Sequence, residues 1–137
     1  MGAAAMGATA LWATARVAPT ISDDIVGAGL APAPISDFLI VSEFLKARFN
    51  AGFASNLFFW RDNVGLEVDL LLDEPEGLLP VEIKSSATVT DDLFKGLRKW
   101  LAVAGDAARL PRLVCAVPES YQRDGINVRR WQEAADQ

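Results

Sequence analysis

Two short runs of alternating apolar and polar residues, Glu67–Leu72 and Leu79–Lys84, constrain the fold of this chain more than any other feature. The residues between them, 73–78, are rich in acids and include Pro75 and Gly77, so the two runs predict a β-hairpin with a long turn. Successive side chains of a strand point to opposite faces. One face of this hairpin is therefore expected to be apolar, and the other to carry charge.

The two faces of the hairpin differ completely in their side chains. The apolar face would carry Val68, Leu70, Leu72, Leu79, Val81 and Ile83, and the charged face would carry Glu67, Asp69, Glu82 and Lys84. If Leu72 lies opposite Leu79, then Asp69 lies opposite Glu82, and carboxylates at that separation repel each other. A divalent cation would relieve the repulsion, because Mg²⁺ is commonly held by one or two carboxylates and water.

The charged face has two alternative interpretations. In the first, Asp69 and Glu82 hold a metal ion and Lys84 positions the attacking water, an arrangement that suits phosphodiester cleavage. In the second, the face is an ordinary solvated surface, on which Lys84 neutralises Glu82 as a surface pair of little energetic value. The spacing of these residues does not decide between the two.

The composition limits the chemistry that the rest of the chain can supply. The 137 residues include no histidine and one cysteine, which excludes a histidine base, a Ser-His-Asp triad and an internal disulfide. Cys115 lies in the apolar run 113–117, where we expect a buried, unreactive thiol. The sequence has no Gly-Lys phosphate loop and no run long enough to span a bilayer. We therefore expect a single cytoplasmic domain without a nucleotide-binding loop.

The net charge of −5 is unevenly distributed along the chain. Residues 1–83 contain four basic and eleven acidic side chains, whereas residues 84–137 contain nine basic and seven acidic ones. A nucleic-acid-binding surface would therefore come from basic residues of the second half, namely Lys84, Lys95, Arg98, Lys99, Arg129 and Arg130. Basic residues toward the end of a helix also suit its dipole, so the pattern has a structural explanation too.

The remaining segments predict helices and strands on both sides of the hairpin. The spacing of Phe38, Val41, Leu45 and Phe49 predicts the apolar stripe of a helix that starts at Asp37 and ends near residue 50. Asp37 and Glu43 point in different directions on this helix, so at most one of them can reach the charged face.

Further segments complete the order helix, three strands, helix, strand, or αβββαβ. These are a strand over 57–61, a helix over 90–104 with basic residues off its apolar stripe, a buried strand over 112–117, a polar loop over 119–125 and a short edge strand over 126–131. The strand–helix–strand unit predicts a parallel pair. Residues 1–34 are expected to be a poorly ordered lead-in or the remnant of a preceding domain, residues 35–131 the folded domain, and residues 132–137 a tail.

This order, with one acid followed by an acid-x-Lys set, resembles the PD-(D/E)XK nuclease superfamily. That resemblance implies the restriction-endonuclease-like fold, an α/β core with a mixed central sheet flanked by helices. The runs Phe59–Asp62, Gly65–Asp69 and Val81–Ser86 look more narrowly like an uncharacterised C-terminal domain of bacterial and archaeal AAA-type ATPases.

The resemblance implies roles for individual residues. Asp69, Glu82 and Lys84 fall on the catalytic motif, and Asp69, Glu82 and Asp37 fall on the metal ligands, with Asp37 where the family usually has Glu. The implied activity is Mg²⁺- or Mn²⁺-dependent cleavage of nucleic acid. The alternative is a non-catalytic domain of the same fold that docks an ATPase module or another protein, or that oligomerises. Because the ATPase part has no counterpart in this sequence, we expect a detached or truncated module.

Overall fold

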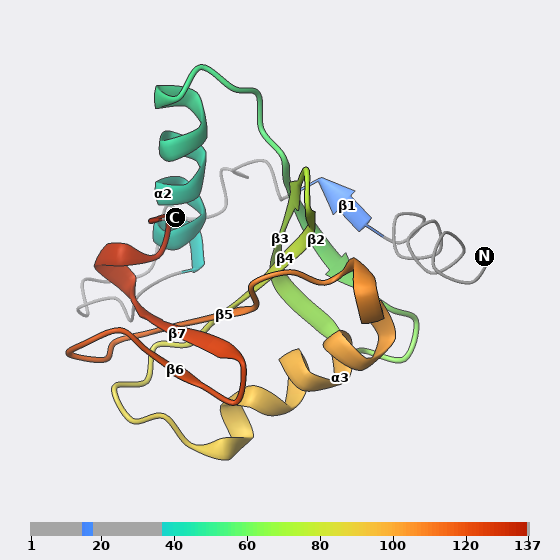
Figure 1. The fold of residues 1–137 in the computed structure, drawn as a ribbon, viewed down its shortest axis with the longest axis vertical. Coiled ribbons are helices and arrows are strands. Elements are labelled where there is room, and N and C mark those ends of the chain that lie inside the picture. The colour runs from blue at the N-terminus through green and yellow to red at the C-terminus, as the bar shows by residue number, and fades with distance from the viewer. Residues whose placement is uncertain (1–14, 18–36, 137) are drawn as a thin grey trace, which may run out of the picture.

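The computed structural model describes residues 15–17 and 37–136 and shows a mixed α/β fold (Figure 1). Its two α-helices are α2 (Asp37–Asn50) and α3 (Lys95–Ala104), and short 3₁₀ turns lie at η2 (Asp91–Phe94), η3 (Gly105–Ala107) and η4 (Trp131–Glu133). The strands are β1 (Ala15–Val17), β2 (Leu57–Arg61), β3 (Glu67–Glu74), β4 (Gly77–Ile83), β5 (Arg112–Cys115), β6 (Tyr121–Arg123) and β7 (Ile126–Arg130).

All the described strands form one mixed sheet in the order β1-β2-β3-β4-β5-β7-β6. Neighbours from β1 to β4 are antiparallel, β4–β5 and β5–β7 are parallel, and β6–β7 is antiparallel. The predicted meander of three strands is therefore confirmed, and so is the parallel pair on either side of α3. The mixed sheet with flanking helices agrees with the predicted α/β class. Its restriction-endonuclease-like assignment stays a prediction.

The C-terminal part of the sheet differs from the expectation. The segment predicted as a polar loop contains β6, which pairs with β7 and forms the sheet edge, so β7 is an interior strand. The connection between them is Asp124-Gly125, and both residues have positive φ, 51° and 76°. This is the backbone of a two-residue hairpin turn whose twist matches that of the flanking strands. The Asp-Gly pair was the local signal for this hairpin.

The segments before and after the expected domain also contain regular structure. Ala15–Val17, from the segment expected to be a lead-in, pairs with β2 as strand β1, and the rest of that segment lies outside the described residues. At the other end, Trp131–Glu133 forms η4 and Ala134 is fully buried. Among the helices of residues 37–136, none combines the length and apolar character that a membrane crossing demands.

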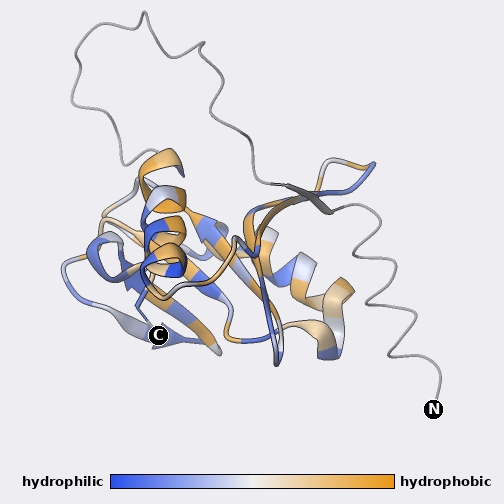
Figure 2. Ribbon diagram, turned by 90° about the horizontal axis from the view of Figure 1, so that it is seen from above, coloured by the Kyte–Doolittle hydropathy of each residue, from blue (hydrophilic) through white to orange (hydrophobic). Residues whose placement is uncertain are grey.

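The sheet lies between the two helices, α2 on one face and η2 with α3 on the other (Figure 1). Ile40 and Phe44 of α2 pack on Leu70, Leu79 and other residues of β3 and β4. On the other face the core is formed by side chains of α3, η2 and five strands, namely Trp60, Val68, Leu71, Leu78, Phe94, Leu97, Trp100, Leu113 and Val128. Figure 2 shows the hydrophobic residues along the strands and helices, with hydrophilic colour in several connecting loops.

The predicted apolar stripe of α2 is confirmed at Val41 and Leu45, which are partly buried against the core, and is wrong at both of its ends. The buried residues are Ile40 and Phe44, whereas Phe38 and Phe49 expose 49% and 59% of their surface. The reason is that α2 carries large apolar side chains on most of its sides, so the spacing of apolar residues does not define one face. The stripe of the second helix is confirmed at Leu97, Trp100 and Ala104, with the first predicted turn forming the 3₁₀ turn η2.

Two glycines fix the turns of the meander in different ways. At Gly77, at the tip of the β3–β4 hairpin, φ is +136° and an added Cβ would lie 2.6 Å from the backbone oxygen of Ala107. At Gly65, in the β2–β3 turn, φ is +92° and an added Cβ would meet nothing within 4 Å. In that turn Asp62 Oδ1 accepts the backbone N–H groups of Val64 and Leu66, at 2.9 and 2.8 Å.

Candidate functional site

The β3–β4 hairpin has the register that the sequence predicts. Leu72 lies opposite Leu79 and Leu70 lies opposite Val81. This register places Asp69 across from Glu82, one residue beyond the last pair of the ladder. Instead of continuing the backbone ladder, Asp69 accepts the backbone N–H of Ile83 with Oδ2 at 2.8 Å. The aspartate side chain therefore closes the open end of the hairpin.

The strict alternation predicted for β3 fails at Val68. Phe58 pairs with Leu71 and Trp60 pairs with Val68, so β3 has one residue more than β2 over this stretch. This is a β-bulge, and it turns Val68 away from the predicted apolar face to pack with Trp60 and Leu71 under α3. Asp69 lies within the bulge, and bulges commonly re-aim a side chain next to a functional site.

The charged face is also less open to water than predicted. Leu71 and Leu78 of that face are buried under α3, and Glu82 is only 7% exposed. A Cβ added to Gly96 of α3 would lie 3.8 Å from Glu82 Oε1, which places the carboxylate against that helix. The interpretation as an ordinary solvated surface is therefore wrong for Glu82.

Asp69, Glu82 and Lys84 converge as the sequence predicts, and we refer to them as the carboxylate–lysine cluster. Lys84 Nζ lies 2.6 Å from Glu82 Oε1 and 3.9 Å from Asp69 Oδ2. Glu82 Oε2 is buried and has no hydrogen-bond partner among the described residues. The side chain of Lys84 remains 35% exposed, so it is not buried in the core.

Burial raises the pKa of both carboxyl groups of the cluster. For Asp69 the burial is opposed by the Ile83 amide and by Lys84, and for Glu82 it is reinforced by the charge of Asp69. Burial disfavours the charge of Lys84, but the hydrogen bond with Glu82 and the attraction of both acids outweigh it and raise the pKa of Lys84. Two acids that resist ionisation and one amine that resists deprotonation thus share a site.

Of the two acids considered on the first helix, Asp37 at the start of α2 is the one whose charge acts on the cluster. Its charge contributes to raising the pKa of Asp69 and of Lys84. Glu43 is instead paired with Lys46, at 2.5 Å, on the exposed side of the helix. Within residues 37–136, no group of three or more His, Cys, Asp or Glu side chains is arranged to hold a metal ion. A metal at this site would therefore depend on two carboxylates, water and substrate.

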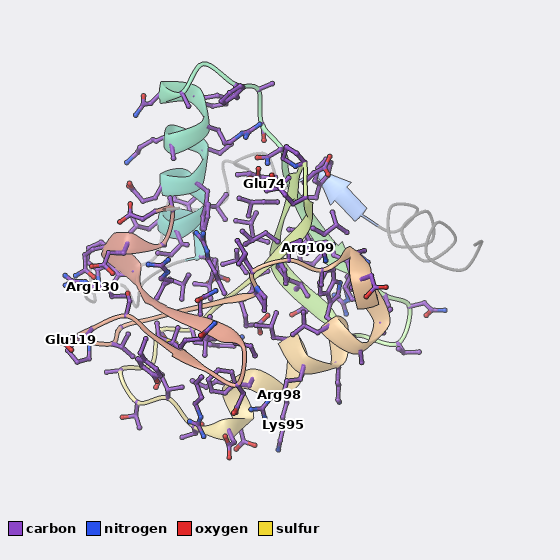
Figure 3. All side chains as sticks on the ribbon, viewed as in Figure 1. Glu74, Lys95, Arg98, Arg109, Glu119 and Arg130 are labelled. Carbon is purple, nitrogen blue, oxygen red and sulfur yellow. The ribbon has the colours of Figure 1, made fainter. Side chains whose placement is uncertain are left out.

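The basic residues that were expected to bind nucleic acid do not form one continuous surface. Lys95 pairs with Asp92, Arg98 with Asp124 and Arg130 with Glu133. Figure 3 shows Lys95 and Arg98 at the start of α3, and Arg130 on a separate side of the view. Lys99 and Arg129 form no ion pair in the part of the chain that the structure describes.

Cys115 is fully buried, as predicted. Burial raises the pKa of its thiol to about 11, so almost no thiolate is present at neutral pH. The cysteine takes no part in the candidate site.

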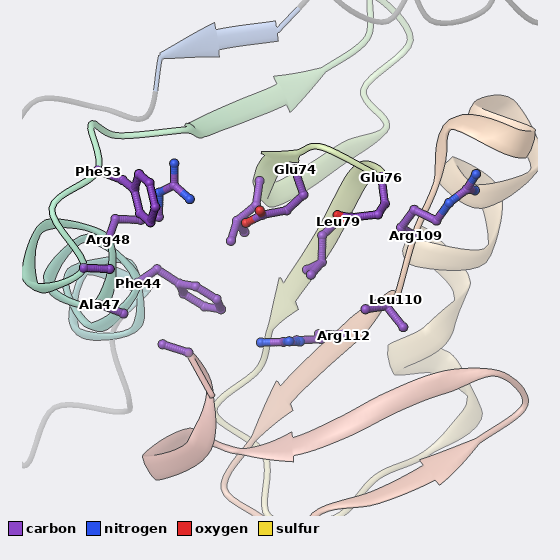
Figure 4. A pocket seen from close by; sticks show the side chains of 13 residues that line it. Phe44, Ala47, Arg48, Phe53, Glu74, Glu76, Leu79, Arg109, Leu110 and Arg112 are labelled. Carbon is purple, nitrogen blue, oxygen red and sulfur yellow. The ribbon is translucent and has the colours of Figure 1, made fainter. Parts of the chain in front are cut away.

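A second site, which the sequence did not predict, lies at the other end of the hairpin. Arg112, the first residue of β5, is only 5% exposed and lines a cavity together with Arg48 and Glu74 (Figure 4). The signal that could have indicated this site is an arginine at the start of a strand predicted to be buried on both faces. Such a charge is rarely buried without a partner.

Comparison with known proteins gives one match. The family model described as "Domain of unknown function (DUF4143)" matches residues 35–133. No curated protein and no solved structure matches the chain.

Proposed function

Because the chain belongs to the DUF4143 family, whose description assigns no function, we propose one from the geometry of the carboxylate–lysine cluster. The proposed function is that of a nuclease-like module, related to the C-terminal part of AAA-type ATPases, which cleaves phosphodiester bonds with Mg²⁺ or Mn²⁺. The observation that carries it is the position of Lys84 Nζ, within 4 Å of both Asp69 and Glu82.

The donor atoms of the cluster fit a hard divalent cation. Glu82 Oε2 has no hydrogen-bond partner among the described residues, although burying a carboxylate oxygen unpaired is unfavourable. Mg²⁺ is usually bound by one or two carboxylates, with water and substrate phosphate completing its shell. Asp69 and Glu82 would be those ligands, and Asp37 would add negative potential from α2. When bound, the ion would polarise the phosphate and lower the pKa of a water molecule.

Each residue of the cluster has a distinct role in this proposal. The Ile83 amide fixes the direction of Asp69, and packing against α3 fixes that of Glu82. The side chain of Lys84 is partly exposed, unlike that of Glu82, so it can turn from the carboxylates toward the attacking water or a phosphate oxygen. A positioned amine at that point stabilises charge that develops in the transition state.

The test is a cleavage assay on plasmid DNA and single-stranded RNA in the presence of Mg²⁺ or Mn²⁺. We expect EDTA to abolish cleavage, and Asp69→Asn and Lys84→Met to lower the rate by about 100-fold or more, the range found for catalytic groups. Asp73→Asn is the matched control, because Asp73 is an exposed aspartate on the same strand whose charge does not act on Asp69 or Glu82. Unchanged cleavage in folded Lys84→Met, or none with any substrate and metal, would overturn the proposal.

A second candidate function is a non-catalytic domain of the same fold that binds a protein partner or oligomerises. Two observations favour it: Lys84 already forms ion pairs with both carboxylates, and Phe49 and Phe53 near the end of α2 are 59% and 58% exposed. Exposed aromatic residues are common at protein interfaces. Sedimentation of the wild type and of Phe49→Ser over a range of concentrations would test oligomerisation, since the variant is expected to remain monomeric at concentrations where the wild type associates.

A further inference from the structure

The cavity beside Arg112 lies between the second half of α2, the tip of the β3–β4 hairpin and the start of β5. Its volume is about 630 Å³, and its apolar walls include Phe44, Leu72, Leu79 and Leu110. Cavities of this size accommodate small organic molecules. The carboxylate–lysine cluster lies at the opposite end of the same hairpin, so the two sites are separate.

Arg112 is the residue that indicates what this cavity binds. It is 5% exposed, its Nη1 donates to the backbone oxygen of Ala134 at 2.9 Å, and its Nε has no partner within the described residues. No carboxylate of residues 37–136 forms an ion pair with it. In Figure 4 its guanidinium extends away from Leu110 and toward Phe44 of α2. A buried guanidinium without an anion is strongly unfavourable unless something else pairs with it.

Among the described residues, no carboxylate forms an ion pair with Arg112; Glu74 and Asp136 attract its charge from a longer range, whereas Arg129 repels it. Arg48 stacks on the ring of Phe53, 4.9 Å from its centroid, and donates to the backbone oxygen of Ala54. Arg109 is directed away from the cavity in Figure 4 and hydrogen-bonds to backbone oxygens of its own loop. Glu74 accepts a hydrogen bond from Asn56 Nδ2 at 3.1 Å, which holds it on the hairpin side.

We propose that this cavity is a binding site for a small amphipathic carboxylate. The apolar body of the ligand would lie against Phe44, Leu72 and Leu79, and its carboxylate would pair with Arg112. A guanidinium matches a carboxylate because two parallel N–H groups meet two oxygens, which is stronger than a single neutral hydrogen bond. This inference does not depend on the proposed nuclease activity.

The experiment uses decanoate as the probe, below its micelle concentration, with the full chain and calorimetric titration. The matched ligands are 1-decanol, which keeps the apolar body without the charge, and decylamine, which reverses it. We expect wild-type protein to bind decanoate at least tenfold more tightly than either. Arg112→Met is expected to remove the preference for decanoate over decanol while decanol binding persists. Lys99→Met is the control, because Lys99 is a surface lysine on α3, away from the cavity.

A second pair of variants keeps the test decisive if Arg112→Met does not fold. Ala47 lies on α2 at the cavity and is exposed, so Ala47→Trp is expected to fold and to block binding of decanoate and decanol alike. Glu74→Gln removes a negative charge from the wall and is expected to strengthen decanoate binding several-fold without affecting decanol. Equal affinity for decanoate and decanol in the wild type, or no binding of either, would overturn the proposal.

Discussion

At the scale of single residues, burial of Glu82 determines how one part of the stability depends on pH. The pKa of Glu82 is raised from its ordinary value of 4.5, by burial first and then by the charge of Asp69. Between 4.5 and the higher pKa of the folded state, the native protein binds more protons than the unfolded chain. Stability from this group is therefore full at low pH and falls as pH rises through that window.

Glu82→Gln removes this titration and nearly preserves the shape of the side chain. We expect the free energy of unfolding of the wild type, minus that of the variant, to fall as pH rises from 4.5 toward neutral, because the wild type must ionise a buried carboxyl group. Urea denaturation at pH values from 4 to 7 measures this difference. A difference that is constant or rises with pH would contradict the assignment of a raised pKa.

The sequence predicted the members of the carboxylate–lysine cluster but not their surroundings. Alternation along two strands and the position of the turn bring Asp69, Glu82 and Lys84 together, and both are local properties. The burial of Glu82 depends on α3 lying over that face, and the position of Asp69 depends on a bulge with β2. The cavity around Arg112 joins α2, the hairpin and β5, so the arginine of a buried strand was a local signal for its position but no local pattern indicated its walls.

At the scale of elements, α2 shows which apolar residues hold a helix on the sheet. Phe44→Ala is expected to lower the free energy of unfolding by about 3–5 kcal/mol, the usual range for a buried phenylalanine. Phe49→Ala, five residues later on the same helix, is expected to change it by about 0.5 kcal/mol or less because Phe49 is 59% exposed. Chemical denaturation of both variants measures these effects. Equal losses would contradict the observed direction of the helix.

Most elements could be predicted from sequence because their signals are local. The three-strand meander, both helices and the parallel pair β4–β5 are present as expected. Strand β6 was missed because none of its residues is buried and the polar Gln122 and Arg123 show no alternation with apolar residues. Only the Asp124-Gly125 turn therefore indicates the hairpin. The buried face of α2 was predicted only in part, at Val41 and Leu45, because only tertiary contacts distinguish Phe44 from Phe49.

At the scale of the whole molecule, ion pairing leaves little positive charge for nucleic acid. Of the six basic residues expected to contact phosphate, only Lys99 and Arg129 form no ion pair within residues 37–136. Two phosphate contacts predict that the logarithm of the affinity falls with the logarithm of the salt concentration with a slope of about −2. Fluorescence anisotropy with a labelled oligonucleotide over several salt concentrations measures this slope. A slope near −5, corresponding to about six contacts, would contradict it.

The two glycine turns of the meander also decide where foreign sequence can be accommodated. At Gly77 the chain passes so close to the Ala107 carbonyl that even a methyl group has no room, which makes the hairpin tip intolerant of lengthening. The turn at Gly65 faces open space, and its neighbour Val64 is 84% exposed. A peptide tag or a fluorescent label inserted at Val64 would therefore leave both the carboxylate–lysine cluster and the cavity intact, whereas the same insertion at the other tip would separate the hairpin from the segment leading into β5.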